Sequence, residues 1–382
     1  MKVAVLGYGT VGFGVREMLK GASGLEAGPV LVRPGKDDAD FKVTSMDEIV
    51  NDPEVGAVAE VMGGVEPAFT YVSAALSAGK HVVTSNKALV AAKGPELARL
   101  AEEKGVAFLF SAACGGGVPI LHNIALAVES DTILSLGGIL NGTTNYMLDA
   151  MQSRDMTYAD ALADAQALGY AEADPTADVS GLDALRKIML ACAVAYGRLP
   201  DSGLCREGIE SITAEDVADL KSRNLTCRLV TSGGLDETGR LYAYIEPVLF
   251  GPSAPECSVL RNFNLAKYDG KNSGSIVFIG QGAGRWPTAS AVLRDLNDIL
   301  HGRRQMMLPS CERVSADNSA CLHSYYVRLP QDKADCLPIR EKSDSGEVCV
   351  VITEPISVEK MHALAAELRK DGAELFFAAI SE

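Results

Sequence analysis

Residues 3–12 read Val-Ala-Val-Leu-Gly-Tyr-Gly-Thr-Val-Gly, an apolar run followed by the pattern G-x-G-x-x-G. The apolar run Val3–Leu6 is typical of a buried parallel strand, and a helical pattern continues from the last glycine to Leu19. Glycines let the backbone approach a pyrophosphate, whose charge the free N–H groups at the helix start can bind. The residues expected to contact a dinucleotide are Gly7, Tyr8, Gly9, Thr10, Val11 and Gly12. The alternative is a tight strand–helix turn without a ligand.

Strands and helices continue to alternate after this turn. Apolar runs predict strands at residues 30–32, 57–62, 81–84 and 107–110, with helices at 67–78 and 87–103 between them. This order predicts an α/β fold with a doubly wound (Rossmann-type) parallel sheet in a dinucleotide-binding domain of residues 1–130. Ligands bind such sheets at the carboxyl ends of the strands. Further cofactor contacts are therefore expected from Gly63, Thr84, Ser85, Lys87 and Gly115.

The end of the second predicted strand bears on the choice of cofactor. An acid there would bind the ribose 2′-hydroxyl of NAD. The strand instead ends in Arg33, with Lys36 close behind and no acid before Asp37. A guanidinium group suits a 2′-phosphate, so NADP is favoured over NAD. The alternative is an arginine that is merely exposed on a loop.

Composition excludes several classes of protein. The 382 residues carry a net charge of −15, which argues against a nucleic-acid or anionic-membrane partner. The nine cysteines include no C-x-x-C pair, and the five histidines lack the paired spacing of a zinc site, so reduced thiols in a cytoplasm are expected. No run of apolar residues has the length of a signal peptide or a membrane-spanning helix.

The stretch from Tyr170 to Lys187 reads YAEADPTADVSGLDALRK and places a row of acids in front of a lysine. Asp183 and Lys187 are four residues apart, so they are neighbours on one face of the helix predicted there. The opposite face is apolar and faces the core. The pair would then present an acid and a proton-transferring lysine to a cleft. The alternative is an ordinary surface ion pair.

Five segments resemble, in content and order, those of the homoserine dehydrogenase family: GYGTVGFGV, VVTSNKALVA, GILNGTTNYML, LGYAEADPTADVSGLDALRK and GQGAGRWPTASAV. They cover the chain from residue 1 to about residue 300. The resemblance implies interconversion of L-homoserine and L-aspartate 4-semialdehyde by hydride transfer with NAD(P), a step in the synthesis of threonine and methionine from aspartate. Other readings are a related oxidoreductase for another amino-acid aldehyde and a non-catalytic NAD(P)-binding sensor.

The resemblance also implies a domain organisation. An α+β substrate-binding and dimerisation domain is expected at residues 131–285, and the helix near 286–301 is expected to return to the dinucleotide-binding domain. A small α+β appendage at 320–382 resembles a shortened ACT domain, because residues 331–345 show little helical periodicity. We favour a structural or dimer-contact role for it over an amino-acid sensor. A homodimer or homotetramer is implied.

The family's catalytic pattern maps onto individual residues of this chain. Lys187 corresponds to the lysine that transfers the proton, Lys87 to a second active-site lysine, and Asp183 to an acid beside them. The positions implied to bind substrate are Glu172, Asp178, Asp183, Thr143 and Tyr170. Gly169 and Gly284 correspond to backbone positions near the cofactor.

One loop departs from the family pattern. Family members commonly have a glutamate where this chain has Ser111, and the loop's carbonyls bind a monovalent cation. The carbonyls of Cys114, Gly116 and Val118 remain available for Na⁺ or K⁺, without the glutamate's charge. Cys114 also resembles the nucleophile of an aldehyde dehydrogenase, but no histidine lies near it in the sequence, so we interpret it as a small loop residue.

Overall fold

The computed structural model describes residues 1–381, and its N-terminal part is a six-stranded parallel sheet. The strand order β3-β2-β1-β4-β5-β6 is the order of dinucleotide-binding folds. The strands are β1 (Lys2–Leu6), β2 (Glu26–Leu31), β3 (Lys42–Val43), β4 (Val55–Glu60), β5 (His81–Thr84) and β6 (Phe108–Leu109). The predicted doubly wound sheet is confirmed, although β3 was not expected and β2 begins before the predicted residue 30.

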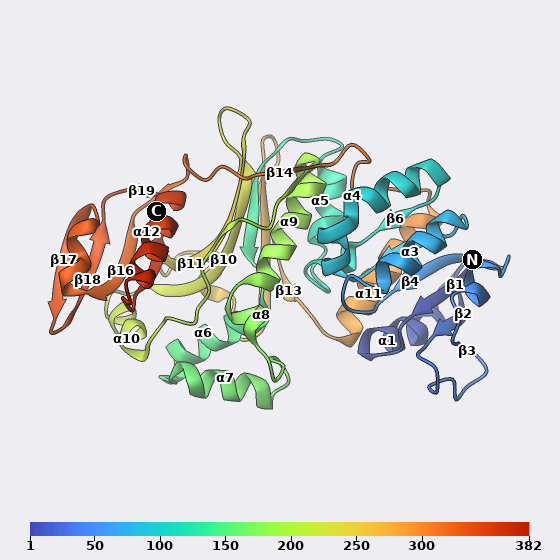
Figure 1. Ribbon diagram of the computed structural model, residues 1–382, viewed down its shortest axis with the longest axis horizontal. Helices are drawn as coiled ribbons and strands as arrows, with labels where there is room; N and C mark the ends of the chain where they lie inside the picture. The colour runs from blue at the N-terminus through green and yellow to red at the C-terminus, as the bar shows by residue number, and fades with distance from the viewer. Residues whose placement is uncertain (382) are drawn as a thin grey trace.

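Helices cover both faces of this sheet (Figure 1). They are α1 (Thr10–Leu19), α2 (Asp47–Val50), α3 (Ala68–Ser77), α4 (Lys87–Lys104) and α11 (Arg285–Leu300). A Cβ atom at Gly12 would lie 2.1 Å from the carbonyl oxygen of Gly7, so only glycine lets α1 start so close to β1. Helix α11, orange in Figure 1, lies among the blue N-terminal elements and packs against α1 at Gly14, far from its neighbours in the sequence.

A second, mixed sheet forms the middle of the molecule. Its N-terminal part consists of β7 (Ile133–Ile139), β10 (Thr226–Leu235), β11 (Leu241–Phe250), β12 (Phe263–Gly270) and β13 (Gly274–Gln281), in the order β13-β12-β7-β10-β11 and all antiparallel. The short β9 (Cys205–Arg206) adds to β11. Helix α9 (Leu182–Tyr196) packs on one face, where Gly233 lies against Ile188 and Cys192. The other face is covered in part by the segment after β11, which includes the 3₁₀ helix η2 (Pro255–Ser258).

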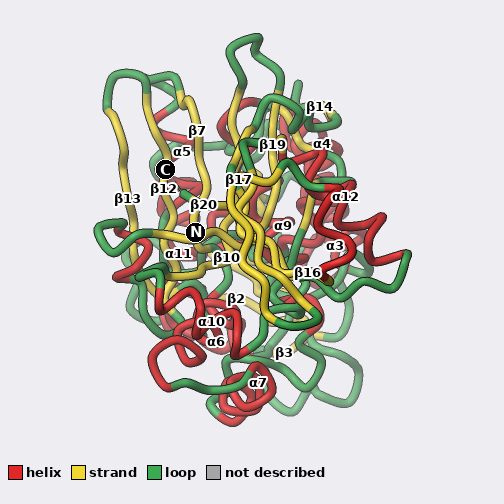
Figure 2. The backbone as a smooth tube through the Cα atoms, turned by 90° about the vertical axis from the view of Figure 1, so that its left-hand side faces the viewer, coloured by secondary structure: helices red, strands yellow, loops and turns green. Residues whose placement is uncertain are grey.

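The remaining helices of this middle region gather at one end of the sheet, below the strands in Figure 2. They are α6 (Gly142–Arg154), α7 (Tyr158–Ala167), α8 (Thr176–Val179) and α10 (Ala214–Ser222). Two small strands, β8 (Arg198–Pro200) and β14 (Glu312–Val314), pair in parallel and tie the chain after α11 to the end of α9.

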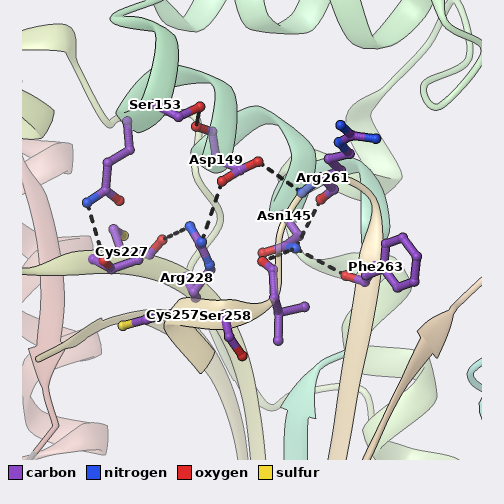
Figure 3. Close-up of polar contacts among 12 residues, drawn as sticks. Asn145, Asp149, Ser153, Cys227, Arg228, Cys257, Ser258, Arg261 and Phe263 are labelled. Carbon is purple, nitrogen blue, oxygen red and sulfur yellow. Dashed lines mark hydrogen bonds and ion pairs between the residues drawn. The ribbon is translucent and has the colours of Figure 1, made fainter. Parts of the chain in front are cut away.

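Helix α6 is anchored by a buried polar cluster (Figure 3). The Asn145 amide nitrogen donates to the carbonyls of Val259, Arg261 and Phe263 at 3.0–3.1 Å. Asp149, one turn further on, accepts from the Arg261 backbone at 2.9 Å and lies 3.8 Å from the buried guanidinium group of Arg228 on β10. These contacts hold α6 against β10 and the loop before β12, and so fix the position of its N-terminus.

The C-terminal region continues the mixed sheet instead of standing apart from it. Strand β20 (Phe376–Ile380) pairs in parallel with β11, and β16 (Tyr325–Pro330), β18 (Val348–Thr353) and β17 (Ile339–Ser345) follow outward. Helix α12 (Val358–Lys370) covers one face of these strands, and β15 (Leu322–His323) pairs with β19 (Ile356–Ser357).

The polar stretch at residues 331–345 is more ordered than predicted. It forms the 3₁₀ helix η3 (Gln331–Cys336) and then the edge strand β17, whose charged side chains suit a solvent-exposed edge. The region therefore has the element order βαββαβ, with the first helix reduced to a 3₁₀ helix, and the strand order β20-β16-β18-β17. That this region is ACT-like stays a prediction from the resemblance.

Candidate active site

The predicted pair Asp183–Lys187 lies at the boundary between the parallel sheet and the mixed sheet. Lys187 Nζ is 2.7 Å from Asp183 Oδ2, which confirms that the two side chains are neighbours on α9. Lys87 Nζ approaches the other oxygen, Asp183 Oδ1, at 3.1 Å. Asp183 and Lys187 are only 7% exposed, so this is no surface ion pair, whereas the Lys87 side chain keeps 36% of its exposure.

Two helix starts bring these groups together. Gly181, with φ at +79°, precedes the first turn of α9 and places Asp183 there. Lys87 is the first residue of α4 in the dinucleotide-binding region, where the Asn86 side chain caps the helix by accepting from the Leu89 N–H at 3.1 Å. The aspartate therefore links a lysine from each of the two regions of the chain.

A buried glutamate orders the strand ends in front of α4. Glu60, the last residue of β4, is fully buried and accepts hydrogen bonds from the Thr84 hydroxyl and from the Met62 N–H at 2.7 Å. The Asn86 backbone in turn donates to the Thr84 hydroxyl at 2.9 Å. Burial is the main cause that raises the pKa of Glu60. Thr84 was expected to contact cofactor, but its hydroxyl is used to hold β4, β5 and the start of α4 in register.

Asn141 is the central residue that the sequence reasoning missed. Its side-chain nitrogen donates to Asp178 at 2.7 Å and to Asp183 at 2.9 Å, while its side-chain oxygen accepts from the Thr144 N–H and caps α6. The preceding carbonyl, that of Leu140, accepts from Lys187 Nζ at 2.5 Å. An asparagine before Gly-Thr-Thr is a helix-cap signal that could have drawn attention to this position.

The electrostatics of the pair follow from burial and mutual attraction. Burial acts to lower the pKa of Lys187, but the charge of Asp183 and the hydrogen bond to it outweigh burial and raise that pKa above its usual range. Burial acts to raise the pKa of Asp183, and Lys187 and Lys87 together hold it well below the usual range. The pKa of Asp178 is raised, mainly by burial. Near neutral pH, these shifts favour an ionised Asp183 paired with a charged Lys187.

The predicted substrate-binding positions divide into two groups. Asp178 and Thr143 border the cluster, and the Thr143 hydroxyl donates to the carbonyl of Tyr170 at 2.7 Å. The Tyr170 ring packs edge-on against Tyr146, with 5.0 Å between the ring centres. Glu172 lies on the exposed loop after α7, and within residues 1–381 its carboxylate has no hydrogen bond or ion pair.

A cavity of about 630 Å³ lies over the glycine turn at the end of β1. A Cβ at Gly9 would meet no atom within 4 Å, so the backbone at the start of α1 is open to a ligand. Thr10, Val11 and Gly12 form the first turn of α1, whose N–H groups lack intrahelical acceptors. The cavity is lined by Gly7, Tyr8, Gly9, Arg33, Lys36, Lys42 and Gly63, among others. Ser85 follows directly after β5.

The loop after β6 lies against α9 and the turn before α11. The Cys114 thiol is buried 3.9 Å from the carbonyl oxygen of Lys187, and burial raises its pKa to about 12, which argues against a thiolate nucleophile. A Cβ at Gly116 would lie 2.5 Å from the carbonyl oxygen of Gly282. The predicted backbone positions Gly115, Gly169 and Gly284 all have positive φ, at +81°, +74° and +122°.

The sheet order, the glycine turn facing a cavity and the buried lysine at the strand ends define a class of protein. The chain is an NAD(P)-dependent oxidoreductase of the dinucleotide-binding α/β type. Residues 7–111 match the family model for the NAD-binding domain of homoserine dehydrogenase, and residues 119–297 match the family model for homoserine dehydrogenase. The chain belongs to the homoserine dehydrogenase family.

Individual relatives agree with this assignment. A homoserine dehydrogenase of Synechocystis sp. is 37% identical over 347 residues, which cover 86% of this chain and 79% of the relative. That of Mycobacterium leprae is 39% identical over 77% of this chain and 71% of the relative. The crystal structure of a homoserine dehydrogenase from Thiobacillus denitrificans superposes with a TM-score of 0.89 at 29% identity, covering 100% of this chain and 98% of that one. A mutant hyperthermophilic archaeal homoserine dehydrogenase in complex with NADPH gives a TM-score of 0.68 at 25% identity, covering 79% and 98%.

Proposed function

We propose that this chain interconverts L-homoserine and L-aspartate 4-semialdehyde with NADP(H) as the preferred cofactor. The observation that carries the proposal is the buried Lys187–Asp183–Lys87 cluster at the boundary between a dinucleotide-binding sheet and a second domain. Membership of the homoserine dehydrogenase family supports the substrate.

Lys187 is assigned the proton transfer. The nicotinamide cofactor supplies the hydride in one direction and accepts it in the other. When the aldehyde carbon gains a hydride, its oxygen needs a proton, which an ammonium group in hydrogen-bond reach can donate. Asp183 keeps Lys187 charged and oriented, and the Leu140 carbonyl fixes a second N–H direction. Lys87, which is partly exposed, is assigned to the reacting oxygen beside the nicotinamide.

The amino-acid end of the substrate is assigned to acids on the α7–α8 side of the cluster. An α-ammonium group pairs well with a carboxylate, and Asp178 and Glu172 are the candidates, with Thr143 and Tyr170 as further contacts. Asp178 is held in place by Asn141, whereas Glu172 is exposed and must approach from its loop. Residues 131–285 would then form the substrate-binding and dimerisation domain.

NADP is favoured over NAD because the cavity wall near the end of β2 is basic. Arg33, Lys36 and Lys42 line it, and Arg33 has no carboxylate partner within the described residues. Lys42 is partly neutralised by Asp38. A free guanidinium beside the ribose is suited to a 2′-phosphate. The NADPH complex of the archaeal relative supports the same choice.

A monovalent cation, Na⁺ or K⁺, is part of the proposal for the loop after β6. In residues 1–381 the carbonyls of Cys114 and Gly116 accept no backbone hydrogen bond, and that of Val118 accepts one, from Ile120 at 2.9 Å. Carbonyl oxygens without other partners are suitable ligands for a hard cation. The ion would stiffen the loop beside the cluster without taking part in proton transfer.

A reducing compartment, the cytoplasm, is proposed as the location. All nine cysteines are free thiols in the structure. Among the described residues, no helix has both the length and the apolar composition needed to cross a bilayer.

The decisive test is an assay of the purified chain with L-aspartate 4-semialdehyde and NADPH, alongside a panel of other amino-acid aldehydes. We expect oxidation of NADPH with the semialdehyde and little with the others. Lys187→Ala should lower kcat by about two to four orders of magnitude, the usual contribution of a general acid–base, and leave cofactor affinity nearly unchanged.

Lys93→Ala provides the matched control, because Lys93 lies on the surface of α4, where it contacts Glu96 and the Phe69 ring and is not part of the Lys187–Asp183–Lys87 cluster. It should retain normal turnover. Equal activity with another aldehyde would reassign the substrate. Near-normal turnover of Lys187→Ala would remove Lys187 from the proton-transfer step, and cofactor binding without any turnover would favour the sensor.

A further inference from the structure

Three side chains outside the candidate active site meet beside the start of the loop after β6. His122 lies on α5 (Ile120–Ala127), and Asp295 and Asp298 lie one turn apart on α11. Each offers one nitrogen or oxygen atom, and these atoms all lie within 4.8 Å of one another. Two helices that are distant in the sequence therefore contribute to one cluster.

Asp295 is the buried member of the cluster, His122 and Asp298 are partly buried, and several of the polar atoms at this point lack hydrogen-bond partners. Asp295 is fully buried; its Oδ2 accepts from the Ser111 N–H at 2.8 Å, but its Oδ1 has no hydrogen-bond partner. His122 Nδ1 and Asp298 Oδ2 are 3.1 Å apart, at ion-pair distance but without the alignment of a hydrogen bond, and within residues 1–381 neither atom forms a hydrogen bond. The Ser111 hydroxyl is unpartnered as well. Buried polar atoms are nearly always satisfied, so several unpartnered atoms at one point indicate a missing bound group.

The negative charge of the two aspartates indicates that the bound group is a cation. A carboxylate as buried as that of Asp295, with the carboxylate of Asp298 within 4.8 Å, is costly unless a cation compensates the charge. Arg294 is near enough for its charge to act on His122 and Asp295, yet in residues 1–381 it forms no ion pair with either aspartate. A neutral water molecule would satisfy hydrogen bonds but would leave the charge uncompensated.

We propose that His122, Asp295 and Asp298 bind a divalent transition metal ion of the zinc class. One imidazole nitrogen with two carboxylate oxygens is a three-ligand set suited to such an ion, and the Ser111 hydroxyl or a water completes four-coordination. Ligands at about 2.0–2.2 Å from a tetrahedral ion lie roughly 3.4 Å apart, close to the separation of His122 Nδ1 and Asp298 Oδ2.

The position of the cluster indicates a structural role. An ion there would join α5 to α11 and, through Asp295, to the backbone of Ser111, where the loop leading to Cys114 begins. The site uses side chains on two helices, and so differs from the backbone carbonyls assigned above to a monovalent cation. It would hold α11 in place between the dinucleotide-binding sheet and the mixed sheet.

The test is zinc binding by the full chain after removal of metal with a chelator. Competition against a chromophoric zinc indicator should show one high-affinity ion per chain, and added Zn²⁺ should raise the melting temperature. Asp298→Asn and His122→Gln should each weaken binding at least tenfold and abolish the shift in melting temperature. His301→Ala, which changes an exposed histidine at the end of α11, should bind like the wild type.

Anomalous scattering at the zinc absorption edge would locate the ion in wild-type crystals even if a variant failed to fold. Density between His122 and the two aspartates supports the proposal. It is overturned if the wild-type chain binds no zinc at micromolar free concentration, if the ion lies elsewhere, or if His301→Ala loses binding as Asp298→Asn does. Equal binding of Mg²⁺, which has little use for an imidazole ligand, would also overturn it.

Discussion

At the scale of single residues, the candidate site depends on one aspartate that holds two lysines. Asp183 contacts Lys187 and Lys87 through different oxygens and receives a further hydrogen bond from Asn141. Burying these charges is favourable only because they compensate one another. Removing one member therefore changes the protonation of the others as well as their positions.

The pH dependence of homoserine oxidation tests this arrangement. In the wild type Asp183 outweighs burial and raises the pKa of Lys187. In Asp183→Asn the charge is gone and burial remains, so the pKa of Lys187 falls and its neutral, proton-accepting form exists at lower pH. The rising limb of the kcat profile should move to lower pH, and kcat should also fall because the lysine loses its orienting partner.

Asp178→Asn is the control for this profile, because Asp178 contributes least among the causes that raise the pKa of Lys187. Its profile should move much less than that of Asp183→Asn. A profile that stays in place in Asp183→Asn, or moves to higher pH, would contradict the role assigned to the aspartate.

Arg33 is the residue whose substitution tests the preference for NADP over NAD. Arg33→Ala should raise the Michaelis constant for NADP severalfold and leave that for NAD almost unchanged, since only NADP offers a 2′-phosphate to the guanidinium group. Steady-state kinetics with both cofactors measures the difference. Arg16→Ala, on the neighbouring helix α1 with its guanidinium stacked on Phe41, serves as a control for loss of a basic side chain. Equal effects of Arg33→Ala on both cofactors would remove the argument for NADP.

At the scale of secondary-structure elements, α6 connects the site to the mixed sheet. Asn141 caps its first turn, and Asn145 and Asp149 attach its next two turns to the loop at residues 259–263 and to β10 (Figure 3). The motif Asn-Gly-Thr-Thr-Asn therefore has two functions: its first asparagine serves the site, and its second serves the fold.

Asn145→Ala tests whether the second asparagine of this motif stabilises the fold. The change removes the donor shared by three buried carbonyls, so we expect the free energy of unfolding to fall by about 1–3 kcal/mol. Urea denaturation measures the loss. Ser153→Ala, near the exposed end of the same helix, removes only a hydrogen bond to the Asp149 carbonyl and should stay within about 0.5 kcal/mol of the wild type. Similar stability of both variants would mean that the polar cluster does not anchor α6.

At the scale of the whole molecule, the mixed sheet joins the middle and C-terminal regions into one body. Strand β20, the last of the chain, lies between β11 and β16, so the C-terminal region shares backbone hydrogen bonds with the middle region. At the far end of the same sheet, Val277 and Ile279 on β13 are 39% and 52% exposed. They share a face with Lys267 on β12, which lies opposite Val277, and this face is turned away from α9.

We predict that this exposed face of the mixed sheet is the interface of a homodimer. Ile279→Lys would place a charge within an apolar contact and should shift the chain towards monomers. Sedimentation velocity measures the change. Leu168→Lys is the control, because Leu168 is 53% exposed but lies at the end of α7, away from the sheet. A wild-type monomer, or an Ile279→Lys dimer as stable as the control, would contradict an interface on this face.

Two strands, the first half of β2 and all of β17, could not be predicted from the pattern of apolar residues. Gly28-Pro29 interrupts β2, because proline lacks the N–H that a ladder needs, and the register with β1 shifts there. Only the last residues of the strand had an apolar signature. Strand β17 was missed because an edge strand can be polar on both faces and then shows no apolar alternation. Its antiparallel hydrogen bonds with β18, which the sequence does not reveal, hold it in the sheet.

The class of fold, the family and the Asp183–Lys187 pair could be predicted from the amino-acid sequence, because these depend on interactions over a few residues. Strand–glycine–helix order and a four-residue spacing on a helix are local, and local geometry follows from the backbone. The resemblance had already implied Lys87 as a second active-site lysine. The folded chain alone shows that the pair is buried, that Asn141 contacts it, and that His122 meets Asp295 and Asp298. Those contacts join segments far apart in the chain, and their distances depend on how whole helices pack against the two sheets.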